Sequence, residues 1–241
     1  MTYKLSLILR GMGINLVAGP ILDIGCGTGR SMKLLHNITG GLVVGIDVNP
    51  VRLKIAKEVY EESSLVCGDA KLLPFRNSCF KLVSLINTLH ELKAELVDSL
   101  LNEVRRILVD KGLLLIVDKC FLPELKPWEE LTILTEKAYH EAKEAVYGIR
   151  SFGIHKPSEI IEFISLRGFR PIYCGIWRIG RRLSSTEFFM SWGKKTFQLL
   201  GMIKDETIRT RIAKLISRIR KLASKYGYGP APVIVALFEI V

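Results

Sequence analysis

The stretch ILDIGCGTGR, residues 21–30, decides the fold of this chain. An apolar run ends in the acid Asp23, three glycines follow in alternation, and a helix-forming segment begins after them. Glycine lets the backbone turn sharply and lets a ligand approach without a Cβ in the way. The N-terminus of the following helix supplies unpaired N–H donors. We therefore expect a ligand-binding turn between a strand and a helix.

The spacing of this turn discriminates between ligands. Nicotinamide dinucleotides are bound by GxGxxG, whereas Gly25, Gly27 and Gly29 have the spacing GxGxG. A dinucleotide would also bring its pyrophosphate close to the Asp23 carboxylate, which is unfavourable. S-adenosylmethionine instead brings an α-amino group and a sulfonium, and a nearby carboxylate suits both. The turn therefore favours S-adenosylmethionine as the cofactor.

Short apolar runs alternate with amphipathic helical segments, which is the pattern of a parallel sheet covered by helices. We expect strands at 20–24, 42–46, 64–67, 80–86, 112–118, 170–177 and 232–240. We expect helices at about 28–38, 50–61, 93–108, 127–147 and 157–167, with Asp110-Lys111-Gly112 as the turn into the fifth strand. The prediction is a single α/β domain over residues 1–241, with a helical lid insertion at about 121–157 and a basic helical insertion at about 180–229.

Three further motifs follow successive predicted strands. Asp47 closes GIDVNP, where a carboxylate can accept both hydroxyls of a ribose; alternatively, it caps the helix that begins near Pro50. Asp69 and Ala70, in GDAKLLPF, can meet the amino group and a ring nitrogen of an adenine. The motif INTLHEL contains Asn87 and leaves the fourth strand. All of them lie at carboxyl ends of strands, the edge at which open α/β sheets bind ligands.

The order ILDIGCGTG, GIDVNP, GDAKLLPF, FKLVSLINTLHEL, LLNEVRRILVDKGLLLIVD resembles class I S-adenosylmethionine-dependent methyltransferases. The chain is most similar to the branch that contains the ubiquinone and menaquinone biosynthesis C-methyltransferases and many small-molecule methyltransferases. The resemblance covers about residues 18–120 and, more loosely, the final strands. It implies a Rossmann-like, seven-stranded, mostly parallel sheet with the last strand antiparallel, helices on both faces and helical lid insertions.

The resemblance also implies a role for each site residue. It places Asp23 near the methionine amino group, Asp47 on the ribose, Asp69 on the adenine and Asn87 near the methionine end of the cofactor. The expected cofactor-binding residues are Asp23, Gly25, Cys26, Gly27, Thr28, Gly29, Asp47, Val48, Asp69, Ala70 and Asn87.

His90, three residues beyond Asn87, is the candidate general base. Methyl transfer is an in-line displacement, so a base is needed only where the nucleophile must lose a proton. The alternative is that His90 merely lines the pocket at the start of a helix. Several side chains of the predicted lid are candidates for acceptor contacts: Trp128, Tyr139, Tyr147, Phe152 and His155. No metal is expected, because no cluster of Cys and His has zinc spacing.

The net charge of +11 is concentrated late in the chain, where residues 193–225 hold ten Lys or Arg against Asp205 and Glu206. One helical face of this segment carries Ile208, Ile212, Leu215, Ile219 and Leu222, and another carries Arg211, Lys214, Arg218, Lys221 and Lys225. The basic face could be solvated, contact RNA or lie on an anionic lipid surface. Because the segment falls between the final two strands, we expect it to cover the acceptor side of the pocket.

The predicted function is S-adenosylmethionine-dependent methyl transfer to a small acceptor, with hydrophobic molecules among the candidates. One alternative is methylation of RNA, above all tRNA, through the basic segment 193–225. Another is a protein that binds S-adenosylmethionine without catalysis, which the intact glycine turn and the three acids disfavour.

The first residues, MTYKLSLILRGMG, are expected to form a short helix and not a signal peptide, because their apolar core is only LSLIL. No apolar run approaches the ~20 residues that span a bilayer. A soluble, cytoplasmic protein is therefore predicted.

Overall fold

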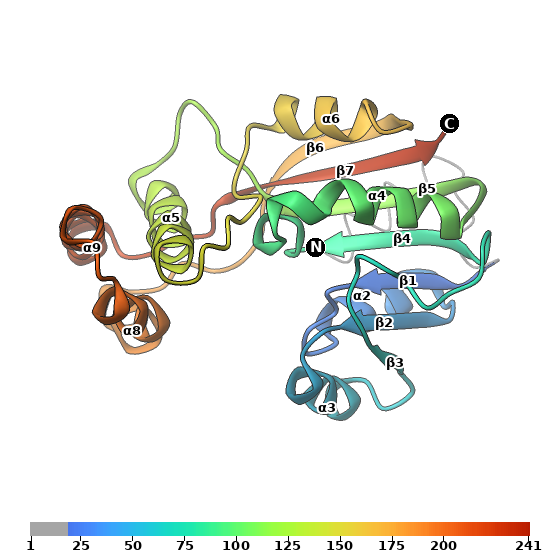
Figure 1. Cartoon of the computed structure of the whole chain (residues 1–241), viewed down its shortest axis with the longest axis horizontal. Coiled ribbons are helices and arrows are strands. Elements are labelled where there is room, and N and C mark those ends of the chain that lie inside the picture. Colours follow the sequence, from blue (N-terminus) through green and yellow to red (C-terminus); the bar gives the residue numbers. More distant parts are fainter. Residues whose placement is uncertain (1–18) are drawn as a thin grey trace.

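The computed structural model describes residues 19–241 and builds them around one seven-stranded sheet with the strand order β3-β2-β1-β4-β5-β7-β6 (Figure 1). The strands are β1 (Ile21–Ile24), β2 (Val43–Asp47), β3 (Ser64–Cys67), β4 (Phe80–Ile86), β5 (Leu108–Lys119), β6 (Phe169–Arg178) and β7 (Pro232–Ile240). β7 lies between β5 and β6 and is antiparallel to both, while the first five strands are parallel. The predicted sheet and its antiparallel last strand are therefore confirmed. The short N-terminal helix predicted from the sequence lies outside the described residues.

Helices cover both faces of the sheet. They are α2 (Arg30–Thr39), α3 (Pro50–Val59), α4 (Val97–Ile107), α5 (Pro127–Tyr147), α6 (Pro157–Ser165), α7 (Ser185–Ser191), α8 (Lys194–Met202) and α9 (Glu206–Tyr226), with 3-10 turns η2 (Leu89–Glu91) and η3 (Ala94–Leu96). α4 and α6 pack their apolar sides into one core cluster, and α2 and α3 contribute to a second. Such two-sided burial explains why the central strands are almost continuously apolar.

The start of β5 differs from the prediction. The turn expected at Asp110-Lys111-Gly112 is an irregularity inside the strand, which already begins at Leu108. The pairing register with β4 shifts there, and Lys111 has a φ of 55°. A residue in this left-handed conformation interrupts the ladder without ending it, as in a β-bulge.

Four helices, α5 and α7–α9, form a separate layer beyond the carboxyl ends of the parallel strands, at the left of Figure 1, which we call the helical cap. Two apolar clusters hold it together, one around Leu131, Phe188 and Ile219 and the other around Leu199 and Ile212. The cap therefore has its own core, distinct from the two that cover the sheet.

α9 packs against α5 with a face slightly rotated from the predicted one. Its fully buried residues are Ile212, Ile216, Ile219 and Ala223, whereas Ile208, Leu215 and Leu222 are only partly buried. The basic residues predicted for the opposite face are all exposed. Within residues 19–241, no helix combines the length and apolarity needed to cross a bilayer.

Candidate functional site

The glycine turn between β1 and α2 adopts left-handed backbone conformations. Gly25 has a φ of 70°, and a Cβ placed on it would lie 2.5 Å from the Thr88 side chain. Thr88 in turn donates its hydroxyl hydrogen to the carbonyl oxygens of Gly25 and Ile86. Any side chain at residue 25 would therefore be strained and would also push the end of β4 away. The glycine predicted first in the motif is required by this close approach.

Asp23, at the end of β1, is buried beneath this turn and bonds to residues of α2 and β4. Its side chain is 1% exposed, and its two oxygens accept hydrogen bonds from Ser31 Oγ at 2.5 Å and Ser84 Oγ at 2.7 Å. Burial raises the pKa of Asp23 from 3.8 to about 6, against the opposing effect of the two serine hydroxyls. Asp23 does not line the cavity described next, so its predicted place at the methionine amino group stays a prediction.

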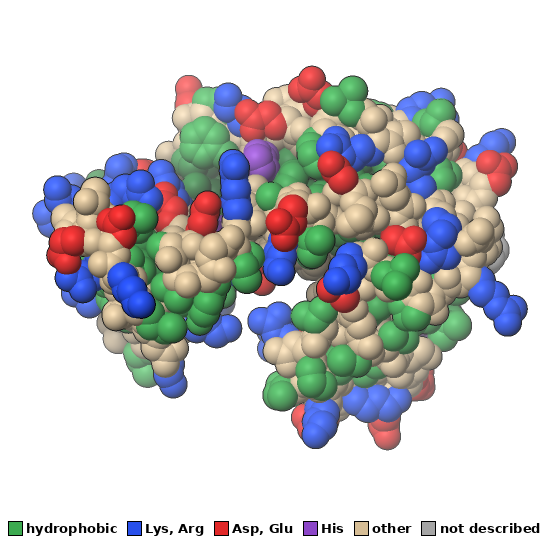
Figure 2. Space-filling model, in the orientation of Figure 1, with side chains coloured by type: hydrophobic (Ala, Val, Ile, Leu, Met, Phe, Trp, Pro, Cys, Tyr) green, Lys and Arg blue, Asp and Glu red, His purple; other side chains and the backbone are tan. Residues whose placement is uncertain are grey.

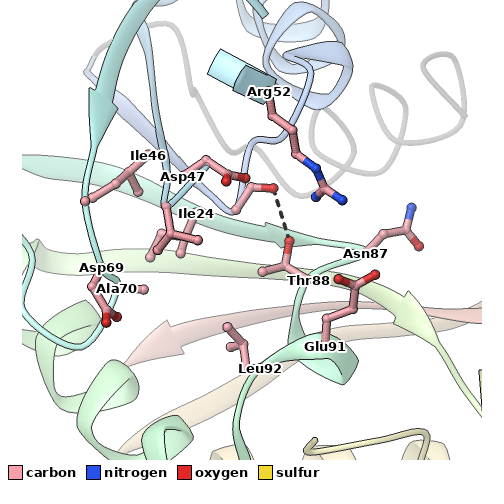
Figure 3. Close-up of a pocket in the computed structure, with 13 residues that line it drawn as sticks. Ile24, Ile46, Asp47, Arg52, Asp69, Ala70, Asn87, Thr88, Glu91 and Leu92 are labelled. Atoms are coloured by element: carbon pink, nitrogen blue, oxygen red, sulfur yellow. Dashed lines mark hydrogen bonds between the residues drawn. The ribbon is translucent and has the colours of Figure 1, made fainter. Parts of the chain in front are cut away.

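A cavity of about 230 Å³ opens at the carboxyl ends of β1, β2, β3 and β4 (Figure 3). Six of the predicted residues line it, namely Gly25, Asp47, Val48, Asp69, Ala70 and Asn87. The other lining residues are Ile24, Ile46, Arg52, Gly68, Thr88, Glu91 and Leu92. The structure therefore brings the acids of two separate motifs and Asn87 around one space, at the edge that the fold predicts.

Four predicted residues of the glycine turn do not line the cavity: Cys26, Gly27, Thr28 and Gly29. Cys26 belongs to the core cluster beneath α2. Burial raises the pKa of its thiol to about 12, with further contributions from Asp23 and Asp47. This cysteine therefore stays protonated and packs as an apolar side chain.

Asp47 connects β2 to the glycine turn. One carboxylate oxygen accepts from the Gly27 amide at 2.9 Å and the other from the Asn49 amide at 2.8 Å. The helix-cap alternative for Asp47 is wrong, because Asn49 is the N-cap of α3 and accepts from the amides of Val51 and Arg52. Asp47 is thus held rigidly at the cavity wall, with oxygen lone pairs left for a ligand.

The remaining predicted residues frame the cavity from two other strand ends. Asp69 is half exposed and accepts from the Lys71 amide at 3.0 Å. Asn87 follows β4 with a φ of 52°, a conformation that asparagine tolerates better than most residues. Its backbone N–H donates to the carbonyl oxygen of Val117 at 2.8 Å. Its side chain is exposed at the cavity.

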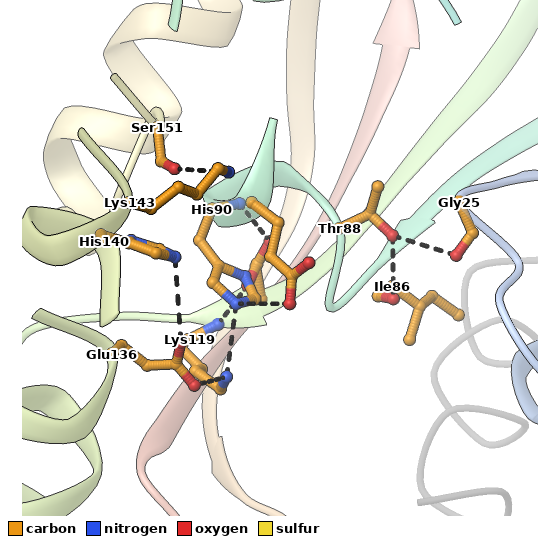
Figure 4. A network of polar contacts seen from close by, with 11 residues as sticks. Gly25, Ile86, Thr88, His90, Lys119, Glu136, His140, Lys143 and Ser151 are labelled. Atoms are coloured by element: carbon orange, nitrogen blue, oxygen red, sulfur yellow. Dashed lines mark hydrogen bonds and ion pairs between the residues drawn. The ribbon is translucent and has the colours of Figure 1, made fainter. Parts of the chain in front are cut away.

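His90 lies behind the cavity wall and does not line it. Its ring is 1% exposed, Nδ1 contacts Asp118 Oδ1 at 2.5 Å, and Nε2 is 3.3 Å from Lys119 Nζ (Figure 4). Lys119 also forms an ion pair with Glu136 of α5 at 2.5 Å. A catalytic role for His90 stays a prediction, and in this arrangement the ring could act on an acceptor only through a neighbouring group.

A second cavity, of about 360 Å³, lies between α3 and the helical cap, and we call it the acceptor cavity. Figure 2 shows the surface hollowed between the cap and the lobe that carries α3. It is lined by Arg52, Glu91, Thr135, Glu136, Tyr139, Leu183, Phe188, Ser191, Trp192, Lys195, Thr196 and Tyr228. Of the five lid side chains predicted to contact an acceptor, Tyr139 lines this cavity, and Trp128, Tyr147, Phe152 and His155 do not.

Arg52 and Glu91 line both cavities and so mark the border between them. Figure 3 shows their side chains extending toward each other beside Asn87. Burial raises the pKa of the neighbouring Tyr139, and the negative charges of Glu91 and Glu136 add to the effect. Sequence reasoning missed both residues, although Glu91 lies within the motif INTLHEL and Arg52 lies two residues after GIDVNP. Only the orientation of α3 and η2 places them at this border.

On its cap side the second cavity is lined by α7, by Trp192 that follows it and by α8, which supply Phe188, Ser191, Trp192, Lys195 and Thr196. The basic helix α9 is not part of it. α9 contributes no lining residue and packs on α5, at the outer end of the molecule in Figure 1. The expectation that the whole segment 193–225 covers the pocket is therefore wrong for its basic helix.

Comparison with known proteins relates to methyltransferases the part of the chain that carries the first cavity, which we call the cofactor cavity. Residues 22–116 match the model of a methyltransferase domain family. The chain is 35% identical over 107 residues to an uncharacterized methyltransferase of Synechocystis sp., covering 43% of this chain and 50% of that protein. It is 31% identical over 100 residues to a sterol 24-C-methyltransferase of Pneumocystis carinii, covering 39% of this chain and 26% of that protein. The chain spans between about one third and three fifths of the length of three curated relatives that it matches, the Synechocystis protein included.

A solved structure extends the likeness to the whole fold. A candidate methyltransferase of Bacillus halodurans superposes with a TM-score of 0.62 at 18% identity, covering 96% of this chain and 97% of that one. None of these matches is specific to the quinone-methylating branch, so that finer assignment stays a prediction. Residues 22–116 belong to the methyltransferase domain family, and residues 19–241 have the fold of a class I S-adenosylmethionine-dependent methyltransferase.

Proposed function

We propose that this protein transfers the methyl group of S-adenosylmethionine to a small molecule held in the acceptor cavity. The observation that carries the proposal is the shared border: Arg52 and Glu91 line both the cofactor cavity and the acceptor cavity. Two ligands in adjoining cavities can be held in the near-attack geometry that supplies much of the rate of a displacement.

The residues present fit the cofactor. Gly25 lines the cavity with backbone alone, Asp47 offers carboxylate lone pairs for ribose hydroxyls, and Asp69 lines the same cavity beside Ala70. When bound, S-adenosylmethionine supplies a methyl group on a positively charged sulfur. The chain's own residues then have to bind the acceptor, orient it and keep water away from it.

Glu91 is the carboxylate best placed to take a proton from the acceptor. It lies at the border of the two cavities, and its Oε1 is 4.0 Å from Nε2 of the buried His90. We propose that Glu91 accepts the proton where the nucleophile must lose one, with His90 and Asp118 as positioning residues behind it. This replaces direct proton abstraction by His90, whose ring contacts neither cavity.

A small acceptor is favoured over RNA by the position of the basic helix. The exposed stripe of α9 is partly neutralised, because Arg211 pairs with Glu141 and Arg218 with Glu130, both on α5. α9 also contributes no residue to the lining of the acceptor cavity, and it packs on α5 at the outer end of the cap (Figure 1). The sterol methyltransferase among the relatives is an example of a related domain that acts on a small, apolar molecule.

The test is a transfer assay with methyl-tritiated S-adenosylmethionine over three cell fractions: metabolites, lipids and tRNA. We expect label in the metabolite or lipid fraction with the wild type, and none with Asp47→Ala at a cofactor concentration that saturates only the wild type. Label in the tRNA fraction would favour the RNA alternative. Binding of S-adenosylhomocysteine without transfer into any fraction would favour a protein without catalysis.

A further inference from the structure

The lining of the acceptor cavity combines stacked aromatic rings with two lysine or arginine cations that lack carboxylate partners among residues 19–241. From this combination we propose that the acceptor is an anionic molecule with a flat, apolar body, carrying a carboxylate, sulfonate or phosphate group. The proposal rests on the proposed function and names the chemical class that the same cavity would take.

The aromatic wall is contributed by α7 and the segments around it. Phe188 stacks on Trp192 with ring centroids 5.2 Å apart and an interplanar angle of 15°, and on Tyr228 at 5.0 Å and 16°. Phe188 is 2% exposed, so the stack is fixed from behind by the cap core. Nearly parallel rings beside a cavity offer flat apolar surface with little rotational freedom. This wall suits a planar or extended apolar body better than a compact polar one.

The acids of the cavity are already engaged. Glu136 is paired with Lys119 at 2.5 Å. Burial opposes its ionisation, but the Lys119 ammonium outweighs this and holds the pKa of Glu136 below its usual value. Glu91 lies at the border with the cofactor cavity, 4.0 Å from the His90 ring. Neither acid is within 4.0 Å of the two cations that line the same cavity.

The cations stand on opposite walls, Arg52 on α3 and Lys195 on α8. Among residues 19–241, no carboxylate oxygen lies within 4.0 Å of either. Arg211 and Arg218 of α9, by comparison, pair with acids of α5 on the open surface. Two cations without a carboxylate partner, on opposite walls of one cavity, provide positive charge that favours an anionic ligand.

The position of the border sets the orientation of this ligand. Lys195 lines only the acceptor cavity, whereas Arg52 and Glu91 also line the cofactor cavity. The reacting atom of the acceptor must lie at the border. The anionic group therefore lies at the other end, toward Lys195, with the apolar body along the aromatic wall between the two.

The experiment compares two fluorescent probes that differ in charge. The sulfonate 1-anilinonaphthalene-8-sulfonate has a flat apolar body and one negative charge, and N-phenyl-1-naphthylamine is its uncharged counterpart. Both are titrated into the protein with saturating S-adenosylhomocysteine, so that the cofactor cavity is filled. The test variant is Lys195→Gln, and the matched control is Lys214→Gln on the exposed face of α9.

We expect Lys195→Gln to weaken binding of the sulfonate probe by about 3- to 10-fold and to change binding of the uncharged probe by less than about 2-fold. Lys214→Gln should change neither. Trp192→Leu should weaken both probes, since it removes part of the wall that they share.

Three results would overturn the proposal: no binding of the sulfonate probe to the wild type, an equal loss of the sulfonate probe in both lysine variants, or an equal loss of both probes in Lys195→Gln. Calorimetry of S-adenosylhomocysteine with each variant keeps this separate from the proposed function. If the wild type binds no S-adenosylhomocysteine, the proposed function is wrong. If it binds S-adenosylhomocysteine but Lys195→Gln affects the two probes equally, only this inference is wrong.

Discussion

The cofactor half of the molecule, β1 to β5, and the helical cap hold their ligand-facing residues in different ways. In the cofactor half these residues follow strand ends, and backbone groups fix them: the Gly27 and Asn49 amides hold Asp47, and Thr88 meets Gly25. In the cap, the rings come from three segments that apolar packing holds together: α5 with Tyr139, α7 and its C-cap with Phe188 and Trp192, and the segment after α9 with Tyr228. The first arrangement fixes one ligand closely, and the second allows a pocket to change by repacking.

This difference has a consequence for mutations. Changes in the cofactor half should alter cofactor affinity whatever the acceptor is. Changes in the cap should alter stability or acceptor recognition and leave the cofactor alone, because the cap residues that line the acceptor cavity do not line the cofactor cavity.

The largest effect is expected in the cap core. Phe188→Ala removes a fully buried ring and should lower the free energy of unfolding by about 3–5 kcal/mol, measured by urea denaturation. The affinity for S-adenosylhomocysteine of the folded variant should stay within about 2-fold of the wild type. Phe189→Ala, next to it but 40% exposed, is the control and should lose much less stability. A fall in cofactor affinity that tracks the reduced stability would break the distinction between the two regions.

Asp47→Ala tests the cofactor half. If the carboxylate takes ribose hydroxyls, removing two charge-assisted bonds should weaken S-adenosylhomocysteine binding by about 10- to 1000-fold in calorimetry. Asn49→Ala, two residues away, removes the N-cap of α3 instead. It should cost about 1 kcal/mol of stability and change affinity only a few-fold. Equal affinity losses in both variants would assign Asp47 a purely structural role.

Asp23 should make the cofactor half sensitive to pH. Its pKa rises from 3.8 in the unfolded chain to about 6 in the folded protein, so the folded state binds the proton more tightly between these values. The resulting stabilisation is fully present below pH 3.8 and disappears as the pH rises through 6. At about 1.4 kcal/mol for each pKa unit, it amounts to about 3 kcal/mol.

Urea denaturation of the wild type and of Asp23→Asn, at several pH values from about 4 to 7, measures this directly. The difference in stability between the two proteins should shift by about 2–2.5 kcal/mol against the wild type over that range, because the unfolded-state carboxyl is already partly ionised at pH 4. A difference that is constant with pH would mean that Asp23 is ionised as readily in the folded protein as in the unfolded chain.

The smallest effect is expected for the outer face of the cap. Replacing Arg211, Lys214, Arg218 and Lys221 together by Gln removes two exposed ion pairs worth at most about 1 kcal/mol each. Cofactor affinity and the weak, salt-dependent binding of tRNA should not change. If the stripe bound RNA, the log–log salt slope would fall by about 0.7–0.9 for each phosphate that these side chains neutralise. A reduced affinity for anionic vesicles would instead show that the stripe binds lipid.

The sequence predicted the two regions to different depths. The sheet, Gly25, Asp47, Asp69 and Asn87 could be predicted because strand, turn and acid are close neighbours in the chain. The acceptor cavity could not, since its walls meet only when α5, α7 and α8 pack together.

His90 shows the same limit at a single residue. Its motif placed it near the cofactor edge, but β5 supplies Asp118 and Lys119 as partners of its ring, and Lys119 in turn pairs with Glu136 of α5. The apolar periodicity of α9 also predicted its buried face one residue out of place: Leu215 was expected on that face, but Ile216 is buried and Leu215 only partly so. Burial of this kind depends on contacts distant in sequence, which no local pattern encodes.

Calorimetry of S-adenosylhomocysteine with the wild-type protein tests the central claim, that the edge formed by Gly25, Asp47 and Asp69 is a cofactor site. NAD serves as the comparison ligand because its pyrophosphate calls for a different glycine spacing. We predict saturable binding of one S-adenosylhomocysteine per chain and none of NAD. Binding of NAD without binding of S-adenosylhomocysteine would contradict the account.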